Sequence, residues 1–186
     1  GLGDGDEQVV LAAHQQVMAS HPAAVLILVP RHPERFERVA QRIRLLGLSF
    51  ARRSLYEELE PTDEIYLADT LGELIGLYAA AEVAFVAGSL VPIGGHSLLE
   101  PAAVGTAMLA GPHNHNAQYI ADQLVAAGGL EFVLEGGALA ERVTTLLADA
   151  EQRALLAENA SKCLNENRGA VTRLLALLEP LIERAV

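Results

Sequence analysis

Short apolar runs alternate with amphipathic stretches along most of the chain. The apolar runs predict six strands, at residues 24–30, 48–53, 64–69, 83–88, 106–111 and 130–134. The segments between them carry apolar residues at helical spacing and predict helices, at residues 9–20, 33–46, 71–81, 97–104 and 116–127. The run AVLILVP at 24–30 contains no polar side chain, which is typical of a strand that is buried on both faces.

Strands that alternate with helices in this way indicate parallel βαβ units. The pattern therefore predicts an α/β fold, a Rossmann-like three-layer domain with a mainly parallel six-stranded sheet. No linker or repeat divides the chain, so residues 1–186 are expected to form a single domain. From Ala138 onward the chain is rich in alanine and leucine and is predicted to be helical, with Gly169 as the break between two C-terminal helices.

Composition narrows the classes of function. The chain has 186 residues, of which 51% are hydrophobic, enough for a sizeable core without a metal or disulfide. The single cysteine, Cys163, excludes an intramolecular disulfide and fits a reducing compartment. A net charge of −11 disfavours nucleic acid as a partner, because a phosphate backbone attracts basic surfaces. No apolar stretch approaches the roughly 20 residues that span a bilayer.

The first residues, GLGDGDEQ, are acidic and glycine-rich, carry no signal-peptide pattern and do not begin with methionine. The chain is therefore expected to be a piece of a longer protein.

Parallel sheets bind ligands beyond the carboxyl ends of their strands, so the loops after the strands are the candidate site. The loop after the first strand carries Arg31, His32 and Arg35 at the start of a helix. Arginine donors together with free N–H groups at a helix end predict an anion site. The alternative for both Arg31 and Arg35 is a solvated position in the first helical turn.

The loop after the third strand begins with Asp69. Thr70 and Glu73 have the spacing of a capping box, which is a structural role. Capping does not explain Gly72, since glycine disfavours a helical first turn. A glycine here can mean that another backbone or a ligand approaches closely.

The loop after the fourth strand has the strongest polar signal. Gly94 and Gly95 would let a ligand lie against the backbone, and His96 and Ser97 follow them, with Ser97 able to cap the helix or bind the same anion. Glu100, one turn later, is placed to accept hydrogen bonds from two vicinal hydroxyls, as on a ribose. Ser89, earlier in the loop, is a weaker candidate.

The loop after the fifth strand contains His113, His115 and Asn116. The two histidines could start a metal site, but no nearby carboxylate or cysteine completes a ligand set. A hydrogen-bonding lip, with Asn116 capping the next helix, is the favoured alternative.

Four segments, taken together and in this order, resemble the C-terminal half of the 3-deoxy-D-manno-octulosonic acid (Kdo) transferases. They are PRHPERF (30–36), ADTLGEL (68–74), GSLVPIGGHSLLEPAAVG (88–105) and GPHNHNAQYI (111–120). The resemblance covers the chain from about Asp6 to Val186. It implies a GT-B glycosyltransferase of lipopolysaccharide biosynthesis, which transfers Kdo from CMP-Kdo to a lipid A precursor (lipid IVA).

The resemblance also implies roles for residues. Arg31 would contact the donor's phosphate or the Kdo carboxylate, the 94–97 turn would hold the CMP phosphate, and Glu100 would bind the ribose hydroxyls. The loop from Asp69 to Gly72 would lie near the cytosine or its phosphate. The chain departs from the family at Ser97, where asparagine is common.

By the same resemblance, the general base, the acceptor site and the membrane-facing surface belong to an N-terminal domain that this chain does not contain. The expected partners are CMP-Kdo, the lipid A precursor, that N-terminal domain and, through it, the cytoplasmic face of the bacterial inner membrane. No cofactor and no metal are expected, and the isolated domain is expected to be inactive. The alternatives are the donor domain of a UDP-sugar transferase or of a UDP-GlcNAc 2-epimerase-like enzyme, and a free-standing nucleotide-binding regulatory domain.

Overall fold

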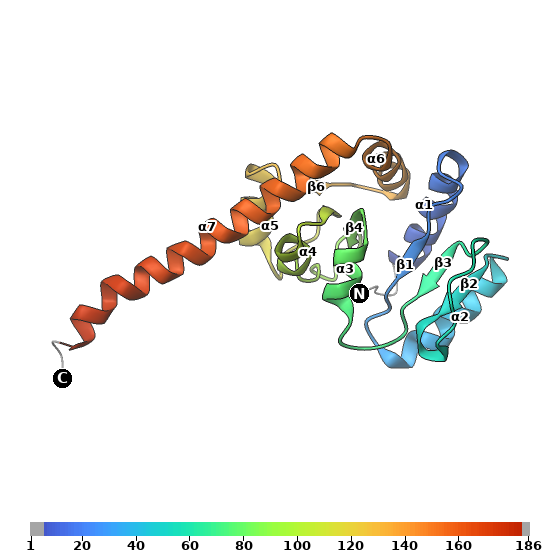
Figure 1. The fold of residues 1–186 in the computed structure, drawn as a ribbon, viewed down its shortest axis with the longest axis horizontal. Coiled ribbons are helices and arrows are strands. Elements are labelled where there is room, and N and C mark those ends of the chain that lie inside the picture. The colour runs from blue at the N-terminus through green and yellow to red at the C-terminus, as the bar shows by residue number, and fades with distance from the viewer. Residues whose placement is uncertain (1–5, 184–186) are drawn as a thin grey trace.

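Within residues 6–183, six short parallel strands form two three-stranded sheets (Figure 1). The computed structural model describes the backbone of residues 6–183 and the side chains of residues 6–167. The first sheet has the order β1-β3-β2, from β1 (Leu26–Leu28), β2 (Phe50–Arg52) and β3 (Ile65–Leu67). The second has the order β4-β5-β6, from β4 (Val83–Val86), β5 (Ala107–Ala110) and β6 (Glu131–Phe132). The predicted α/β fold with six parallel strands is confirmed, with the strands divided between two sheets.

Helices precede, separate and follow the strands. They are α1 (Asp6–Ser20), α2 (Phe36–Leu45), α3 (Leu74–Ala80), α4 (Leu99–Val104), α5 (Gln118–Ala126), α6 (Gly136–Ala148) and α7 (Ala150–Glu183). Two 3₁₀ turns, η1 (Pro33–Arg35) and η2 (Arg53–Leu55), lead from β1 into α2 and away from β2. None of the helices within residues 6–183 combines the length and the hydropathy that a membrane crossing requires.

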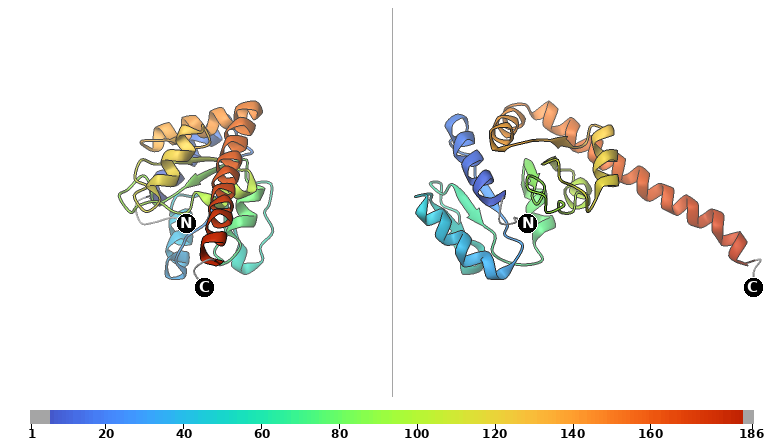
Figure 2. Two further views of the ribbon diagram at one scale, coloured as in Figure 1. Left: turned by 90° about the vertical axis from the view of Figure 1, so that its left-hand side faces the viewer. Right: turned by 180° about the vertical axis from the view of Figure 1, so that it is seen from behind.

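The predicted helix break at Gly169 is wrong. α6 and α7 are separated at Asp149, whose backbone is extended. The Asp149 carboxylate accepts hydrogen bonds from the backbone N–H groups of Glu151 and Gln152, at 3.1 and 3.0 Å, and so caps α7. Gly169 lies within α7, because one glycine costs only about 1 kcal/mol in a helix, too little to end it. α7 runs along the second sheet and then projects away from the body of the fold (Figure 2).

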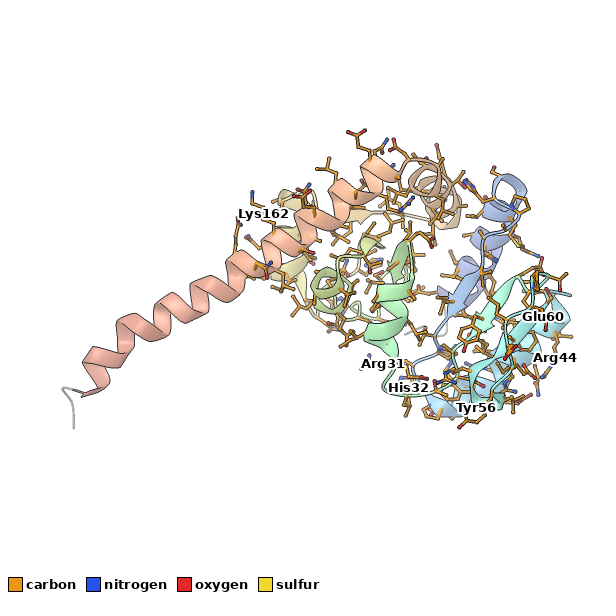
Figure 3. All side chains as sticks on the ribbon, viewed as in Figure 1. Arg31, His32, Arg44, Tyr56, Glu60 and Lys162 are labelled. Carbon is orange, nitrogen blue, oxygen red and sulfur yellow. The ribbon has the colours of Figure 1, made fainter. Side chains whose placement is uncertain are left out.

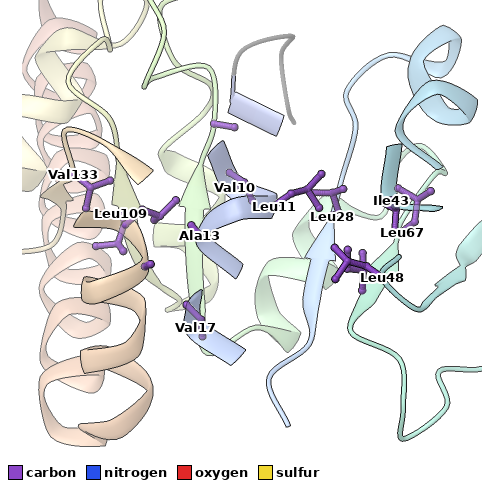
Figure 4. Close-up of a cluster of buried hydrophobic side chains, with 14 of the residues drawn as sticks. Val10, Leu11, Ala13, Val17, Leu28, Ile43, Leu48, Leu67, Leu109 and Val133 are labelled. Atoms are coloured by element: carbon purple, nitrogen blue, oxygen red, sulfur yellow. The ribbon is translucent and has the colours of Figure 1, made fainter. Parts of the chain in front are cut away.

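The main core joins both sheets through α1. Side chains of α1 lie between those of the first sheet and those of the second (Figure 4). Val39, Ala40 and Ile43 of α2 belong to the same cluster. β5 is buried along its whole length: Ala107 and Leu109 face this core, while Met108 and Ala110 face a second core under α4, α5 and α7. Burial on both faces, expected for the run at 24–30, is only partial in β1, where Leu28 is buried but Leu26 and Ile27 are half-buried, and it is complete in β5.

The two sheets do not join into one ladder. Among the described residues, strand pairing stays within each sheet, and β1 and β4 face a cavity of about 1130 Å³ between them. Its wall is mostly apolar and includes Val10 and Val17 of α1, Leu28 of β1 and Phe85 of β4. The relative position of the sheets therefore depends on helix packing and on loop contacts.

Candidate functional site

A cleft of about 520 Å³ lies where the loops that follow β1, β3, β4 and β5 meet. This volume is within the range of small-molecule sites. The polar or glycine positions of the sequence-predicted set that line it are Arg31, Thr70, Gly72, Gly95, His96, Ser97, Glu100 and Asn116. The loops lie at the carboxyl ends of strands from both sheets, so the cleft crosses the seam between the sheets.

Arg31 reaches across this seam. Its Nη1 lies 2.9 Å from Nδ1 of His96, which joins the loop after β1 to the loop after β4. Because arginine can only donate hydrogen bonds, Nδ1 of His96 is the acceptor. Arg31 is exposed (Figure 3), so its remaining donors can reach an anion in the cleft.

Glu100 lies in the first turn of α4 and lines the same cleft. Within the described part of the chain, its carboxylate makes no hydrogen bond or ion pair. Burial, with a smaller contribution from the nearby Glu100 charge, raises the pKa of Tyr78 to about 12. Glu100 is therefore a half-buried acceptor whose oxygens can receive hydrogen bonds from a ligand.

The glycines at 88, 94 and 95 are required by the shape of the loop. All three have positive φ, at 78°, 110° and 76°, which L side chains rarely adopt. A side chain at position 94 would also collide with Asn116, and one at position 95 with Asn114. Gly94 itself does not line the cleft. The close approach that the glycines allow is therefore an approach of the neighbouring loop.

The loop at 111–116 docks on the glycine-rich loop and forms a lip. The N–H groups of His113 and Asn116 donate to the carbonyl oxygens of Ser89 and Gly94, at 2.9 and 3.0 Å. Ser89 is buried, and its hydroxyl accepts a hydrogen bond from the Gly111 N–H at 2.7 Å. Ser89 and His113 thus lie outside the cleft wall, and Ser89 has a structural partner.

The prediction that Asn116 caps the following helix is wrong. Ala117 is the N-cap of α5 and makes no side-chain cap bond. The Asn116 amide instead donates weakly to the Ile93 carbonyl, at 3.4 Å, and so strengthens the contact between the two loops. Ser97 likewise does not cap α4. The N-cap residue is Leu98, which makes no side-chain cap bond, and the helix begins at Leu99. The Ser97 hydroxyl is exposed in the cleft.

The loop after β3 is not the capping box that the spacing predicts. α3 begins at Leu74, Glu73 is its N-cap residue, and the Thr70 hydroxyl bonds the Glu73 carboxylate rather than a backbone N–H. Glu73 also accepts two hydrogen bonds from the Arg53 guanidinium, which lower its pKa. Gly72 has φ of 85°, which turns the chain before the helix and explains the glycine.

Asp69 lies behind the cleft and does not line it. Its carboxylate is buried and accepts hydrogen bonds from Ser54 and Arg52. Burial would raise the pKa of Asp69, but the Ser54 hydrogen bonds and the Arg52 guanidinium outweigh it and hold the pKa below its ordinary value. Asp69 therefore connects the β3 loop to β2 and η2.

His32 and Arg35 also lie away from the cleft wall. His32 is exposed beside Arg31 at the edge of the fold (Figure 3). Arg35 is buried, and its Nη2 donates to Oε2 of Glu7 at 2.7 Å. The solvated position considered for Arg35 is therefore wrong, because Glu7 of α1 provides a buried partner.

Several residues of the site were not predicted. The cleft wall also contains apolar positions, at Val29, Pro30, Leu71, Leu74, Leu77 and Ala117. Asp6 and Asn114 are buried and hold the loops from behind, through Gly88 and Gly111 respectively. In the sequence, the only signal for Asp6 is an acidic residue at the start of a helix. Within residues 6–167, no three histidine, cysteine, aspartate or glutamate side chains gather as a metal site would require.

Curated proteins from several bacteria that are similar to this chain are named 3-deoxy-D-manno-octulosonic acid transferase. The chain is 40% identical over 184 residues to the 3-deoxy-D-manno-octulosonic acid transferase of Haemophilus influenzae, a match that covers 98% of this chain and 43% of that protein. It is 36% identical to the transferase of the same name from Bordetella pertussis, with 91% and 40% covered. The chain thus spans about two fifths of the length of these relatives. No model of a protein family matches it.

A solved structure shares both fold and sequence with this chain. It is the crystal structure of the C-terminal CMP-Kdo binding domain of WaaA from Acinetobacter baumannii, with a TM-score of 0.84 and 34% identity. The match covers 88% of this chain and 85% of that one. With this identity over most of a solved domain, and with the four loops meeting in one cleft, the chain belongs to the 3-deoxy-D-manno-octulosonic acid transferase family, where it corresponds to the C-terminal domain.

Proposed function

We propose that this chain binds CMP-Kdo in the 520 Å³ cleft, as the donor-binding domain of a glycosyltransferase that transfers Kdo to a lipid A precursor (lipid IVA). One observation carries the proposal: the loop after β1 brings Arg31, and the segment that leads from β4 into α4 brings Ser97 and Glu100, into the same cleft. A cation, a hydroxyl and an unpaired carboxylate match the phosphate and vicinal hydroxyls of a nucleotide. The CMP-Kdo binding named for the similar Acinetobacter domain supports the same ligand.

The chemistry of each group suggests how CMP-Kdo would lie. Arg31 would bind the phosphate or the Kdo carboxylate, with N–H groups of the 94–97 turn and the Ser97 hydroxyl beside it. The six-residue α4 is short, so these direct donors matter more than its dipole. Glu100 would accept hydrogen bonds from the ribose hydroxyls. The base would then lie against the loop from Thr70 to Gly72, which Asp69 supports from behind.

In the full transferase, an acceptor hydroxyl oxygen would form a bond to the anomeric carbon of Kdo. The bond from that carbon to the phosphate oxygen would break, and CMP would leave with the electron pair. Arg31 would stabilise the charge that develops on the departing phosphate. The proton of the acceptor hydroxyl would pass to a general base, which we place in a part of the family protein that this chain does not cover. Direct displacement of this kind inverts the anomeric centre.

The wider setting is part of the same proposal. The lipid A precursor would reach the donor from an N-terminal domain across the cleft, at the cytoplasmic face of the inner membrane. The acidic surface of this chain fits a role in which it handles the soluble donor while another part faces anionic lipid. A donor held by arginine and backbone N–H groups needs no metal ion at its phosphate, and this domain alone would be inactive.

Calorimetric titration of this chain with CMP, UMP and CDP tests the proposal. We expect CMP to bind, and UMP to bind more weakly, because cytosine and uracil differ in their hydrogen-bonding edge. Binding of CMP to wild type but not to Arg31→Ala would support the cleft as the site. A clear preference for UMP would instead indicate a UDP-sugar enzyme, and the absence of binding by any of the three nucleotides would contradict the proposal.

A further inference from the structure

The first turn of α1 carries two adjacent acidic side chains that are almost completely buried. Asp6 is 0% exposed and Glu7 is 2% exposed. Acidic side chains are rarely buried unless other groups bind them, because burial removes their hydration. Acidic residues are favoured in the first turn of a helix by its dipole, but that effect does not require burial. The partners of the two carboxylates show what their burial achieves.

Asp6 holds the loop after β4. One of its carboxylate oxygens, Oδ2, accepts a hydrogen bond from the backbone N–H of Gly88. The Gly88 carbonyl in turn accepts a hydrogen bond from the Gly95 N–H at 2.7 Å. The ring of His96 lies against Gly88 so closely that a Cβ there would be 3.0 Å from its Nε2. Gly95 and His96 line the cleft, so Asp6 fixes the cleft wall that belongs to the second sheet.

Glu7 holds the loop after β1. Its Oε2 accepts a hydrogen bond from Arg35 Nη2 at 2.7 Å, and its Oε1 lies 3.7 Å from Arg42 Nε. Arg35 ends the η1 turn, and its N–H donates to the carbonyl of His32 at 3.0 Å. Arg31 comes directly before His32 in this loop. Glu7 therefore fixes the cleft wall that belongs to the first sheet.

Asp6 and Glu7 are adjacent in one helical turn, but their contacts lead to opposite walls of the cleft. No strand pairing joins the sheets within the described residues, so the distance between the walls is not set by a ladder. On the open side of the cleft, the hydrogen bond between Arg31 and His96 also connects the walls. This bond is exposed and would compete with a bound anion, whereas the contacts of Asp6 and Glu7 are buried behind the walls.

We propose that Asp6 and Glu7 are positioning residues that set the spacing of the two walls of the donor cleft, and through it the affinity for the CMP part of the donor. The inference rests on the proposed function of the cleft. Asp6 acts through Gly88 on Gly95 and His96, and Glu7 acts through Arg35 on Arg31. Neither carboxylate lines the cleft, so neither would touch the ligand.

The first experiment measures CMP affinity by calorimetry, at a temperature at which circular dichroism shows that each variant is folded. Asp6→Ala removes the acceptor for Gly88, and we expect CMP to bind at least about tenfold more weakly. Asp6→Asn keeps a carbonyl oxygen in the same place, so its affinity should stay within about threefold of wild type. Glu7→Ala should weaken binding as Asp6→Ala does, because Arg35 loses its buried hydrogen bond to Glu7.

The matched control is Asp122→Ala on α5. Asp122 is exposed and also accepts one side-chain hydrogen bond, from Gln118 at 2.8 Å, but it lies away from the cleft wall. Its removal should leave the affinity unchanged. Should Asp6→Ala fail to fold, Asp6→Glu replaces it: the charge remains, but the longer side chain displaces Gly88, and CMP binding should weaken. Wild-type affinity in folded Asp6→Ala or Asp6→Glu and in Glu7→Ala would overturn the proposal.

The second experiment measures the wall spacing without ligand. Spin labels at Gln41 on α2 and Gln123 on α5, both exposed positions, report the distance between the two halves in a Cys163→Ala background. We expect one narrow distance distribution for wild type and Asp122→Ala, and a shifted or broadened one for Asp6→Ala and Glu7→Ala. Unchanged distributions in both variants would overturn the spacing role. Failure of wild type to bind CMP would contradict the proposed function, and the label distances would still decide the role of Asp6 and Glu7.

Discussion

Glu100 differs from the other acidic side chains around the cleft in having no partner within the described residues. Asp69 and Glu73 are engaged by arginines, as are Glu7 and Glu37 further away. An unengaged carboxylate in a cleft wall is available to a ligand at no cost in broken hydrogen bonds. This contrast, rather than the position of Glu100 in a helix, is the reason why we propose Glu100 as the residue that binds the sugar of a nucleotide.

Glu100→Gln tests this role. A hydrogen bond to a charged group contributes about 1.5–3 kcal/mol, so the amide should weaken CMP binding by roughly tenfold or more. The fold should tolerate the change, since no internal bond is lost. Calorimetry measures the affinity, and dCMP, which lacks the 2′-hydroxyl, provides the matched ligand: the variant should lose less affinity for dCMP than for CMP. Equal losses for both ligands would contradict the ribose contact.

Asp69 should make the free energy of unfolding depend on pH in the acidic range. Its pKa is lowered in the folded protein, mainly because Ser54 and Arg52 hydrogen bonds outweigh burial. A carboxyl with a lowered folded pKa adds stability above its unfolded pKa, about 3.9, and this stability is lost as the pH falls through the folded value. Asp69→Asn should therefore be less stable than wild type at pH 7, by about 1–3 kcal/mol. The difference should shrink below about pH 4.

Urea unfolding of wild type and Asp69→Asn at a series of pH values measures this difference. Asp122→Asn is the control, because its carboxylate is exposed. A gap between wild type and Asp69→Asn that stays constant from pH 7 to about pH 2 would show that the Asp69 charge contributes nothing, and that only the shape of the side chain matters.

At the scale of elements, two loops depend on their backbones lying in direct contact. A Cβ on Gly111 would lie 2.2 Å from the Ser89 carbonyl oxygen, which is backbone and cannot rotate away. Gly111→Ala must therefore separate the 88–97 and 111–116 loops. We expect it to destabilise the fold by about 2–4 kcal/mol and to weaken CMP binding together with it.

Gly76 is the matched control for Gly111. It lies in α3, where a Cβ would meet no described atom within 4 Å. Gly76→Ala should stabilise the protein by about 0.5–1 kcal/mol, since alanine favours a helix. Thermal unfolding of both variants measures the contrast. Stabilisation by both substitutions would show that the two loops are free to separate.

Hydrophobic periodicity is sufficient to predict the elements, but it predicts some of their ends wrongly, because the hydrogen bonds of nearby polar side chains decide where a helix begins. The strands at 83–86 and 107–110 and the helix α1 follow from apolar spacing that burial enforces. α3, α4 and α5 each begin two or three residues later than the pattern predicts, because Thr70, Ser97 and Asn116 bond other partners or face the cleft instead of capping. A side chain that can cap can also bind a loop, and the sequence does not show which partner is near.

At the scale of the whole molecule, the parallel topology predicts where the candidate site lies. The packing that decides which side chains enter the cleft cannot be predicted from the sequence. The rule that ligands bind beyond the carboxyl ends of parallel strands correctly predicts that the four loops lie together. It could not separate Arg31, in the cleft, from Arg35, four residues later and paired with Glu7. That distinction depends on Glu7 of α1, which lies 28 residues before Arg35 in the chain and whose position no local pattern reveals. The division into two sheets was missed for the same reason.

Because the cleft joins two sheets that share no strand pairing within residues 6–183, a bound nucleotide should stabilise both halves. Ligand at about 100 times its dissociation constant adds about 2.7 kcal/mol to the stability of the folded state. We expect CMP at that excess to raise the unfolding midpoint, and to slow amide hydrogen exchange in β1 and β3 as well as in β4 and β5. Protection confined to one sheet would mean that the nucleotide binds one wall only. Glu100→Gln at the same CMP concentration is the control: both effects should shrink together, because both follow from occupancy of one cleft.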